Sequence, residues 1–324
     1  MLKDKRPLTM FAKRQKTAAL KDERPIVFGL LSFVLCLLSF VLCPLSLQAQ
    51  VPVVKPDLSK PTGIAPAYFG PNALPVIDMS DGLTQRTLSV ELAAESYIGY
   101  NNNNTVDIFA RVRVPLFTRW ANLSLWMPVY GWYKQYDGTG HGAGDVYIST
   151  DVQVLHNEWF KTANAKYIPQ MTVRLGMKTA SGEQFERRRH YDCPAYFFDL
   201  AMGQTIPVRQ VSLRFAGSVG FLCWQTDNAR QNDAVMYGLQ ATLRQEYFSM
   251  QATWGGYVGW ERYGDAPMSI KVRAAGHAKG FEPYVQYQYG IKDYPFHQIR
   301  AGLIYHMDIL DRCAKREKTA HYVR

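Results

Sequence analysis

Three consecutive arginines, Arg187, Arg188 and Arg189, separate two stretches in which polar and apolar residues alternate. A guanidinium group binds a phosphate or a carboxylate through two parallel hydrogen bonds. The run therefore predicts an anion-binding tip on the connection between the two stretches, with lipopolysaccharide or an anionic solute as the ligand. The alternative is a solvated tip, or one folded back against acidic side chains, that binds no ligand.

A second group of charged residues recurs on the polar faces of the alternating stretches. Its candidates for a lumen or constriction are Arg111, Arg113, Asp145, Arg174, Lys178, Asp199, Arg214 and Arg300. The two cations in 105–115 and the two in 168–179 outnumber the acids near them, which favours a basic constriction for anions if these faces enclose a lumen. The alternative is mutual neutralisation across neighbouring strands, as we expect for Glu91 and Arg113.

Signals for catalysis, cofactors and metals are weak. Ser96 and His297 lie near the ends of the first and last alternating stretches and have the same outward phase, so a Ser–His pair that cleaves lipid acyl groups is one alternative. No adjacent motif supports this pair. The glycine-rich stretch 138–144 lacks the Lys-Ser/Thr of a phosphate-binding loop, and no His–Cys spacing indicates zinc. We therefore expect no catalytic residue, cofactor or metal.

The first 49 residues have the layout of a secretory signal peptide. A basic segment, 1–24, precedes an apolar run, 26–43, and Pro44 and Ala49 follow, so we expect cleavage near Ala49. A retained anchor is the alternative, because about 20 apolar residues span a bilayer. Of the 37 Lys/Arg and 27 Asp/Glu, 8 and 3 lie in this segment, so the remainder has a net charge of +5 rather than +10. This balance argues against a nucleic-acid partner.

The remaining chain divides into a proline-rich leader or hatch (50–84), a long region of period two (85–310) and a basic tail (311–324). Alternation places successive side chains on opposite faces of a strand. We expect about twelve strands: 86–100, 105–115, 119–131, 144–155, 168–179, 194–205, 209–223, 234–244, 246–258, 267–276, 281–290 and 297–309. Strands of this length suit a tilted crossing of a bilayer, which needs about 9–11 residues.

These strands predict an all-β fold, a closed antiparallel transmembrane β-barrel. Short connections such as 206–208 alternate with longer ones such as 180–193, as in outer-membrane barrels. Aromatic residues cluster near strand ends, where they form interfacial girdles. A soluble β-sandwich is the alternative, but it uses shorter strands. The connection 156–167 is longer than this scheme predicts for its side.

Cysteine usage in the exported region leaves a disulfide open. Cys193 and Cys223 fall at the same end of neighbouring predicted strands, and Cys313 lies in the tail. The strand phase sends Cys193 inward and Cys223 outward, so a disulfide between them requires a bulge.

One segment resembles a known family. The stretches "GHGAGDVYISTDVQVL" (140–155), "RLGMKTASG" (174–182) and "YFFDLAMG" (196–203) are similar to outer-membrane proteins of the phenol-degradation MetA-pathway-like family. The resemblance covers about 140–205 and implies an outer-membrane channel or binding protein for a small hydrophobic or aromatic solute. The surplus of cations on the polar faces also makes an anionic solute a candidate. A lipid hydrolase and a structural or adhesive barrel remain the alternatives.

Overall fold

The protein is described by a computed structural model that covers residues 74–99, 104–116, 119–135, 138–162, 164–182, 194–225, 231–260, 264–293 and 295–308. The predicted signal peptide, the first part of the leader (50–73), Arg187–Arg189, Cys193 and the tail (311–324) lie outside these residues. Among the residues covered, no helix is long and apolar enough to cross a membrane.

The described chain is built almost wholly of antiparallel strands. In chain order they are Leu88–Ile98 (β1), Asn104–Pro115 (β2), Ala121–Gln135 (β3), Gly138–Gly142 (β4), Tyr147–Leu155 (β5), Gln170–Lys178 (β6), Ala195–Val208 (β7), Val211–Gln225 (β8), Gln231–Arg244 (β9), Phe248–Gly259 (β10), Met268–Gly276 (β11), Phe281–Lys292 (β12) and His297–Met307 (β13). Two short 3₁₀ turns, Asn157–Trp159 (η2) and Ala165–Tyr167 (η3), lie between β5 and β6.

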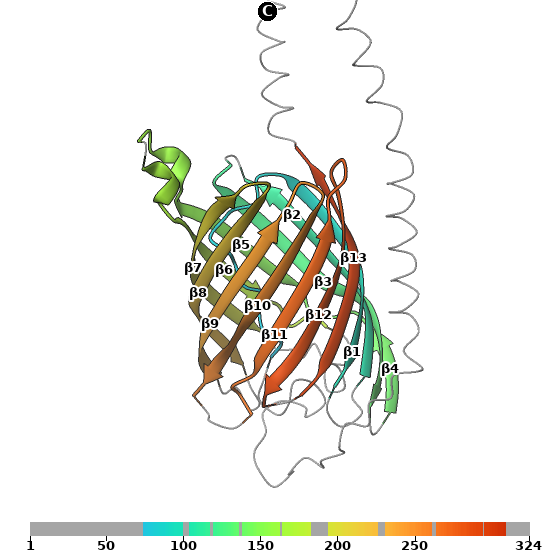
Figure 1. Ribbon diagram of the computed structural model, residues 1–324. Coiled ribbons are helices and arrows are strands. Elements are labelled where there is room, and N and C mark those ends of the chain that lie inside the picture. The colour runs from blue at the N-terminus through green and yellow to red at the C-terminus, as the bar shows by residue number, and fades with distance from the viewer. Residues whose placement is uncertain are drawn as a thin grey trace, which may run out of the picture.

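Twelve of these strands close into a barrel (Figure 1). Each pairs with its neighbours in the chain, and β1 also pairs with β13, Leu88 opposite Met307 and Ile98 opposite His297. The predicted all-β barrel of about twelve strands is therefore confirmed. The short β4 was missed, because its sequence, GTGHG, has no alternation. It pairs only with the far half of β3, at the edge of the barrel.

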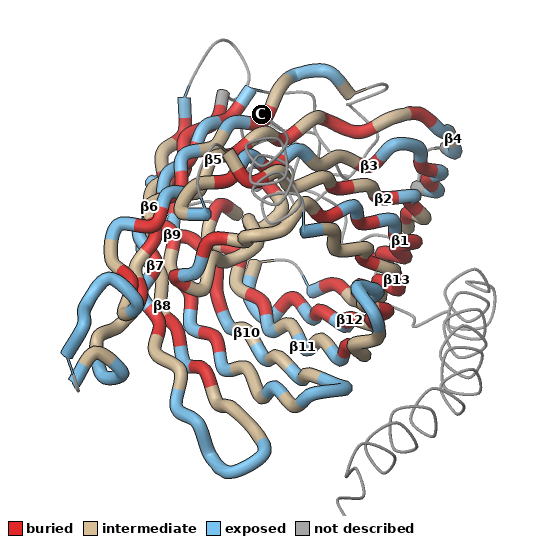
Figure 2. Tube along the Cα trace, turned by 90° about the horizontal axis from the view of Figure 1, so that it is seen from above, coloured by how far each residue is buried: buried red, intermediate tan, exposed pale blue. Residues whose placement is uncertain are grey.

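The barrel is polar inside and apolar outside. On β1, Leu92 is 60% exposed on the outer face, whereas its neighbour Glu91 is 2% exposed and points into the lumen. On β9, Leu239 is 59% exposed and Gln240 is buried. Figure 2 shows buried and more exposed positions alternating along the strands. An outer surface of this kind suits lipid rather than water, because lipid-facing positions of a membrane barrel are apolar.

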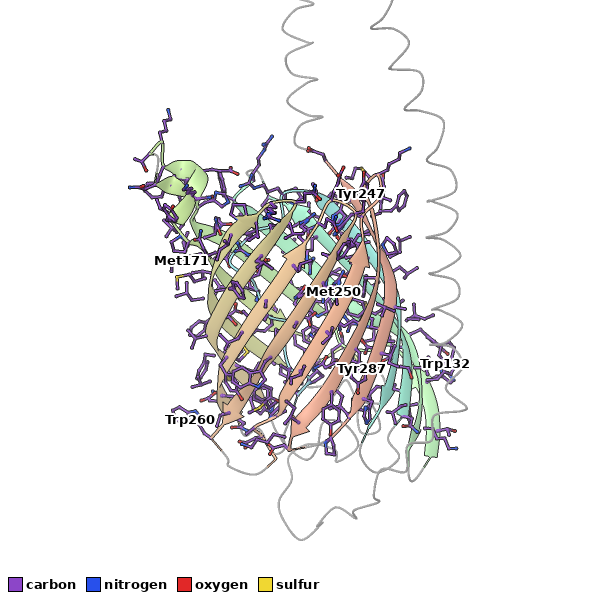
Figure 3. All side chains as sticks on the ribbon, viewed as in Figure 1. Trp132, Met171, Tyr247, Met250, Trp260 and Tyr287 are labelled. Carbon is purple, nitrogen blue, oxygen red and sulfur yellow. The ribbon has the colours of Figure 1, made fainter. Side chains whose placement is uncertain are left out.

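Exposed aromatic side chains lie near both ends of the barrel. Tyr247, at the upper end in Figure 3, is 66% exposed, and Trp260, at the lower end, is 69% exposed. Met250 and Tyr287 project from the outer wall between these levels. Rings at two levels match the girdles that hold membrane barrels at the two headgroup regions.

The two ends of the barrel differ in their connections. At the upper end of Figure 1, β1 begins and β13 ends, and the turns 209–210 and 245–247 are tight. The exception is 156–169, which holds η2 and η3 and projects beside the upper rim. The connection that follows β2 and the turn 277–280 also lie at the upper end, whereas the connections that follow β1, β3, β6, β8, β10 and β12 lie at the lower end.

The described part of the predicted leader or hatch lies inside the barrel. Residues 74–87, which we call the plug segment, have no regular structure and contact the inner wall along their length. Leu74 lies at the lower end, and the segment rises to the upper rim, where Leu88 begins β1. The lumen is thus occupied by the chain's own backbone.

Candidate functional site

An apolar cluster fills the lower end of the lumen. Leu74 is 1% exposed and packs among inward-facing rings and aliphatic side chains from many strands: Tyr97, Tyr147, Phe197, Leu222, Trp224, Tyr257 and Phe296. The Tyr257 hydroxyl donates a hydrogen bond of 2.7 Å to the Leu74 carbonyl oxygen. This contact satisfies two buried polar groups, so the cluster both closes this end and holds the start of the plug segment.

Higher in the lumen, Asp78 of the plug segment bridges two walls. Its Oδ2 accepts a hydrogen bond of 2.8 Å from Nη2 of Arg111 on β2, and its Oδ1 accepts one from Nζ of Lys271 on β11. The Arg111 side chain is 8% exposed and that of Lys271 is 14% exposed, whereas that of Asp78 is 37% exposed. The two cations are therefore embedded in the wall, and the carboxylate borders open space.

Asp81 fixes the plug segment to a third wall. Arg214 of β8 donates to the Asp81 carboxylate at 3.1 Å and to its carbonyl oxygen at 2.5 Å. The backbone lies so close to the wall that a Cβ on Gly203 would come within 2.4 Å of the Asp81 carbonyl oxygen. The next residue, Gly82, has a φ of +83°, a conformation that glycine adopts without strain. The close contact between the plug segment and the wall therefore depends on Gly82 in the segment and on Gly203 in the wall.

Gln153 of β5 holds the following turn of the plug segment. Its side-chain oxygen accepts a hydrogen bond of 2.9 Å from the Thr84 backbone N–H, and its side-chain nitrogen donates to the Gly82 carbonyl oxygen at 2.8 Å. Gln153 is 5% exposed. A buried amide that pairs with the backbone in both directions fixes the position of the segment.

At the upper rim, Arg86 ties the plug segment to the connection that follows β5. Its guanidinium donates to Glu158 at 3.0 Å, contacts Nε2 of His156 at 3.1 Å, and lies 4.7 Å from the centre of the Trp120 ring. The other ring nitrogen of His156 faces the Glu158 backbone N–H at 3.2 Å. Burial and the Arg86 charge lower the pKa of His156, and the hydrogen bond from Arg86 lowers the pKa of Glu158.

The wall residues predicted for a lumen all point inward, and most of the cations are paired with acids. Arg174 donates to Asp199 at 2.7 Å, Lys178 pairs with Asp145, and Arg300 pairs with Glu95. Asp145 lies just before β5 rather than on it and also accepts the Gly182 backbone N–H at 2.6 Å. This geometry matches the self-neutralising alternative over much of the wall.

Two predicted candidates depart from that pattern. Glu91 does not pair with Arg113 as expected: the register sets it opposite Arg111, whose Nη1 lies 3.7 Å away. Arg113 lies opposite Ser89, and its guanidinium donates to the side-chain oxygen of Gln85 at 3.0 Å. Arg113 lies two residues further along the same face of β2, so it is a diagonal neighbour of Glu91 rather than its direct partner. Arg113 therefore donates its hydrogen bond to a neutral oxygen, while the Glu91 and Asp151 carboxylates attract its charge from a longer distance.

Aromatic rings hold the central cations in place. The guanidinium carbon of Arg111 lies 5.1 Å from the centre of the Phe109 ring and 5.3 Å from that of Trp126. The guanidinium carbon of Arg300 lies 4.2 Å from the centre of the same Phe109 ring. That of Arg273 lies 3.8 Å from the centre of the Tyr284 ring. A cation over a ring face is stabilised by the ring quadrupole. The rings of Phe109, Trp126 and Tyr284 therefore stabilise these cations before any solute enters.

A cavity of about 990 Å³ remains between the plug segment and the wall. Its lining includes Asp78, Arg111, Arg113, Trp126, Lys271 and Arg273, and it reaches the upper turns 246–247 and 277–280. It is larger than most sites for single small molecules, which span about 300–1,000 Å³. Its lower limit is the level of the apolar cluster, so the cavity opens toward the upper end.

The residues of the hydrolase alternative are not brought into contact. His297 lies opposite Ile98, and Ser96 lies opposite Ile299, both on the outer face. The hydrogen bond that His297 Nδ1 makes is with the Tyr287 hydroxyl, at 2.8 Å. Within the described ranges, no group of three His, Cys, Asp or Glu residues is placed to hold a metal.

Comparison with known proteins places the chain by architecture only. No protein-family model matches it, and no curated protein matches its sequence. Solved structures with a similar fold include the COG4313 outer membrane channel from Pseudomonas putida F1, with 9% identity, coverage of 71% of this chain and 100% of that one, and a TM-score of 0.47. The NanC porin has 13% sequence identity, with coverage of 67% of this chain and 98% of that one, and a TM-score of 0.44. The CymD monoaromatic hydrocarbon channel has 8% sequence identity, with coverage of 76% of this chain and 97% of that one, and a TM-score of 0.35. These values are too low to support an inference about function, which rests below on the chain's own residues.

The plug segment supplies the site residues that sequence reasoning missed. Asp78 and Asp81 lie in the leader, outside the alternating stretches on which the candidate search relied. Gln153 and Tyr257 are neutral, so a search for charge passed over them. One signal was present: the leader carries acids in "IDMSD" (77–81) directly before the first strand, and the predicted lumen had a surplus of cations.

Proposed function

We propose that this chain is an outer-membrane channel that admits a small solute with a negative charge and an apolar or aromatic body, and that its plug segment closes the resting state. The observation that carries the proposal is a large polar cavity inside a barrel with an apolar outer face, closed below by the chain's own segment. Closed barrels of this type cross outer membranes because every backbone polar group is paired.

The lining supports the choice of solute. Buried cations on β2 and β11 face the cavity beside the Trp126 ring, and Arg113 has a neutral partner. A solute that carries a carboxylate or phosphate would be drawn to these cations, and its apolar or planar body would lie beside the Trp126 ring, which Arg111 and Tyr147 already contact. Cleavage of a signal peptide near Ala49 and binding of lipopolysaccharide by Arg187–Arg189 would agree with the same location, and both stay predictions.

The proposal is tested by reconstituting the purified full-length chain in planar bilayers under a salt gradient. We expect rare openings whose reversal potential indicates a preference for anions. In proteoliposomes, benzoate should enter faster than benzylamine, a cation of similar size. No current above that of a protein-free membrane, or a preference for cations, would contradict the proposal. Acyl release from lipid, lost in Ser96→Ala, would instead favour the hydrolase.

A further inference from the structure

The cavity contains a preformed pair of cations whose partner belongs to the irregular plug segment rather than to the barrel wall. Arg111 and Lys271 lie on β2 and β11, which three strands (β1, β13 and β12) separate in the barrel, and both contact the carboxylate of Asp78. The plug segment is irregular, whereas both cations lie on paired strands. Separation of the acid from the pair therefore requires a change in the plug segment alone, whereas strand pairing fixes both cations.

The two cations differ in what remains to them without Asp78. Arg111 still has Glu91 at 3.7 Å and is flanked by Phe109 and Trp126. Lys271 makes its ion pair in the described structure with Asp78. A buried ammonium group without an anion is costly. Departure of the plug acid thus leaves a site that requires a negative group between two fixed cations.

We propose that Arg111 and Lys271 form a carboxylate-binding site for the transported solute, and that Asp78 is an internal stand-in for the solute's carboxylate. This inference rests on the proposed function and names its substrate class: small monocarboxylates with an aromatic or apolar body. The solute carboxylate takes the two hydrogen bonds that Asp78 gives up. The body of the solute lies in the cavity beside Trp126, which stacks on Tyr147 with 5.1 Å between ring centres.

The proposal explains why entry of solute and release of the plug segment would be coupled. A ligand shifts an equilibrium by its differential affinity for the two states. With Asp78 bound, the cation pair is occupied, and the solute's apparent affinity falls by the fraction of time that the site is free. A carboxylate that binds the free site favours the undocked plug. A neutral compound of the same shape gains nothing from it.

The test measures binding of benzoate to the full-length chain in detergent by calorimetry, with benzyl alcohol as the neutral probe. For Asp78→Asn we expect benzoate to bind at least about tenfold more tightly than to the wild type, because competition by the plug acid is removed. The double variant Asp78→Asn with Lys271→Met should lose that gain. The control is Glu246→Gln, which removes an acid from the rim of the same cavity at a position away from the cation pair.

Each outcome decides the proposal. Equal gains in Asp78→Asn and Glu246→Gln would reduce the effect to general electrostatics and overturn it, as would equal binding of benzyl alcohol. The mobility of the unboiled protein on a gel, which is characteristic of a folded barrel, checks that each variant is intact. Tight benzoate binding with no current in any variant would keep the site and reject the channel. Currents that benzoate leaves unchanged, without tighter binding, would keep the channel and reject the site.

Discussion

The hydroxyl of Tyr257 donates a hydrogen bond of 2.7 Å to the carbonyl oxygen of Leu74, a residue 183 positions earlier in the chain. Both residues are at most 1% exposed. This contact joins the wall of the barrel to the deepest described point of the plug segment. It sets the strand β10 and the plug in one cluster, so opening the lower end requires that this hydrogen bond break.

Tyr257→Phe should therefore make openings more frequent without changing the barrel. Loss of one buried hydrogen bond costs about 0.5–1.5 kcal/mol, which corresponds to about a two- to tenfold rise in the ratio of open to closed time. Single-channel recordings measure this ratio directly. Tyr237→Phe, on the outer face of β9 near Trp254, is the matched control and should leave it unchanged. An unchanged ratio in Tyr257→Phe would show that the hydrogen bond between Tyr257 and Leu74 does not hold the plug segment closed.

Gly203→Val should displace the plug segment from β8. The new side chain would meet the Asp81 carbonyl oxygen and the Arg214 guanidinium, both within 2.6 Å of its Cβ. Overpacking of this kind costs about 1–3 kcal/mol. We expect faster hydrogen exchange over residues 78–84. At Gly217 a Cβ would find its nearest neighbour at 3.5 Å, so Gly217→Val is the control and should leave exchange unchanged.

Acidification should loosen the upper anchor of the plug segment. Nδ1 of His156 accepts the Glu158 backbone N–H, so the neutral ring carries its proton on Nε2, and protonation of Nδ1 removes this acceptor and adds a charge beside Arg86. Because the folded-state pKa lies below the usual value, the contact is at full strength above pH about 6.5 and weakens as the pH falls from there. The protection factors for hydrogen exchange over 156–162, which correct for the intrinsic pH dependence of exchange, should fall between pH about 7 and 5.

The glutamate of this anchor titrates in a different range. Arg86 lowers the pKa of Glu158, so its contribution is lost only below the usual glutamate value of about 4.3. The change between pH about 7 and 5 thus belongs to His156. His156→Gln should flatten it, and a pH response that survives this substitution would show that another group is responsible.

The barrel itself followed from the sequence because alternation is a local signal. Residues such as Leu92 and Glu91 differ in polarity, and a period of two sets them on opposite faces whatever their partners. Register is not local: Glu91 met Arg111 rather than Arg113, because strand pairing depends on turn geometry outside either strand. The path of residues 74–87 was also beyond reach, since an irregular segment has no period and is placed by long-range contacts such as that of Asp81 with Arg214.

The outer face should tolerate no charge at mid-height. Leu239→Arg places a cation where lipid is expected and should lower the free energy of unfolding from lipid vesicles by about 2–4 kcal/mol. Gln240→Arg, one residue away but directed into the lumen, should cost less. Urea titration followed by tryptophan fluorescence measures both. Equal costs at the two positions would contradict a lipid-covered outer face.

The central claim is that the plug segment closes the lumen, and a reversible crosslink tests it most directly. The hydroxyl oxygens of Ser80 and Thr172 are 3.0 Å apart, which places cysteines at both positions within reach of a disulfide. The variant Ser80→Cys with Thr172→Cys, with Cys193, Cys223 and Cys313 replaced by serine, is recorded in planar bilayers before and after reduction. We predict no openings while the disulfide is formed and restored openings after reduction. Openings of equal size and frequency in the two states would contradict the account.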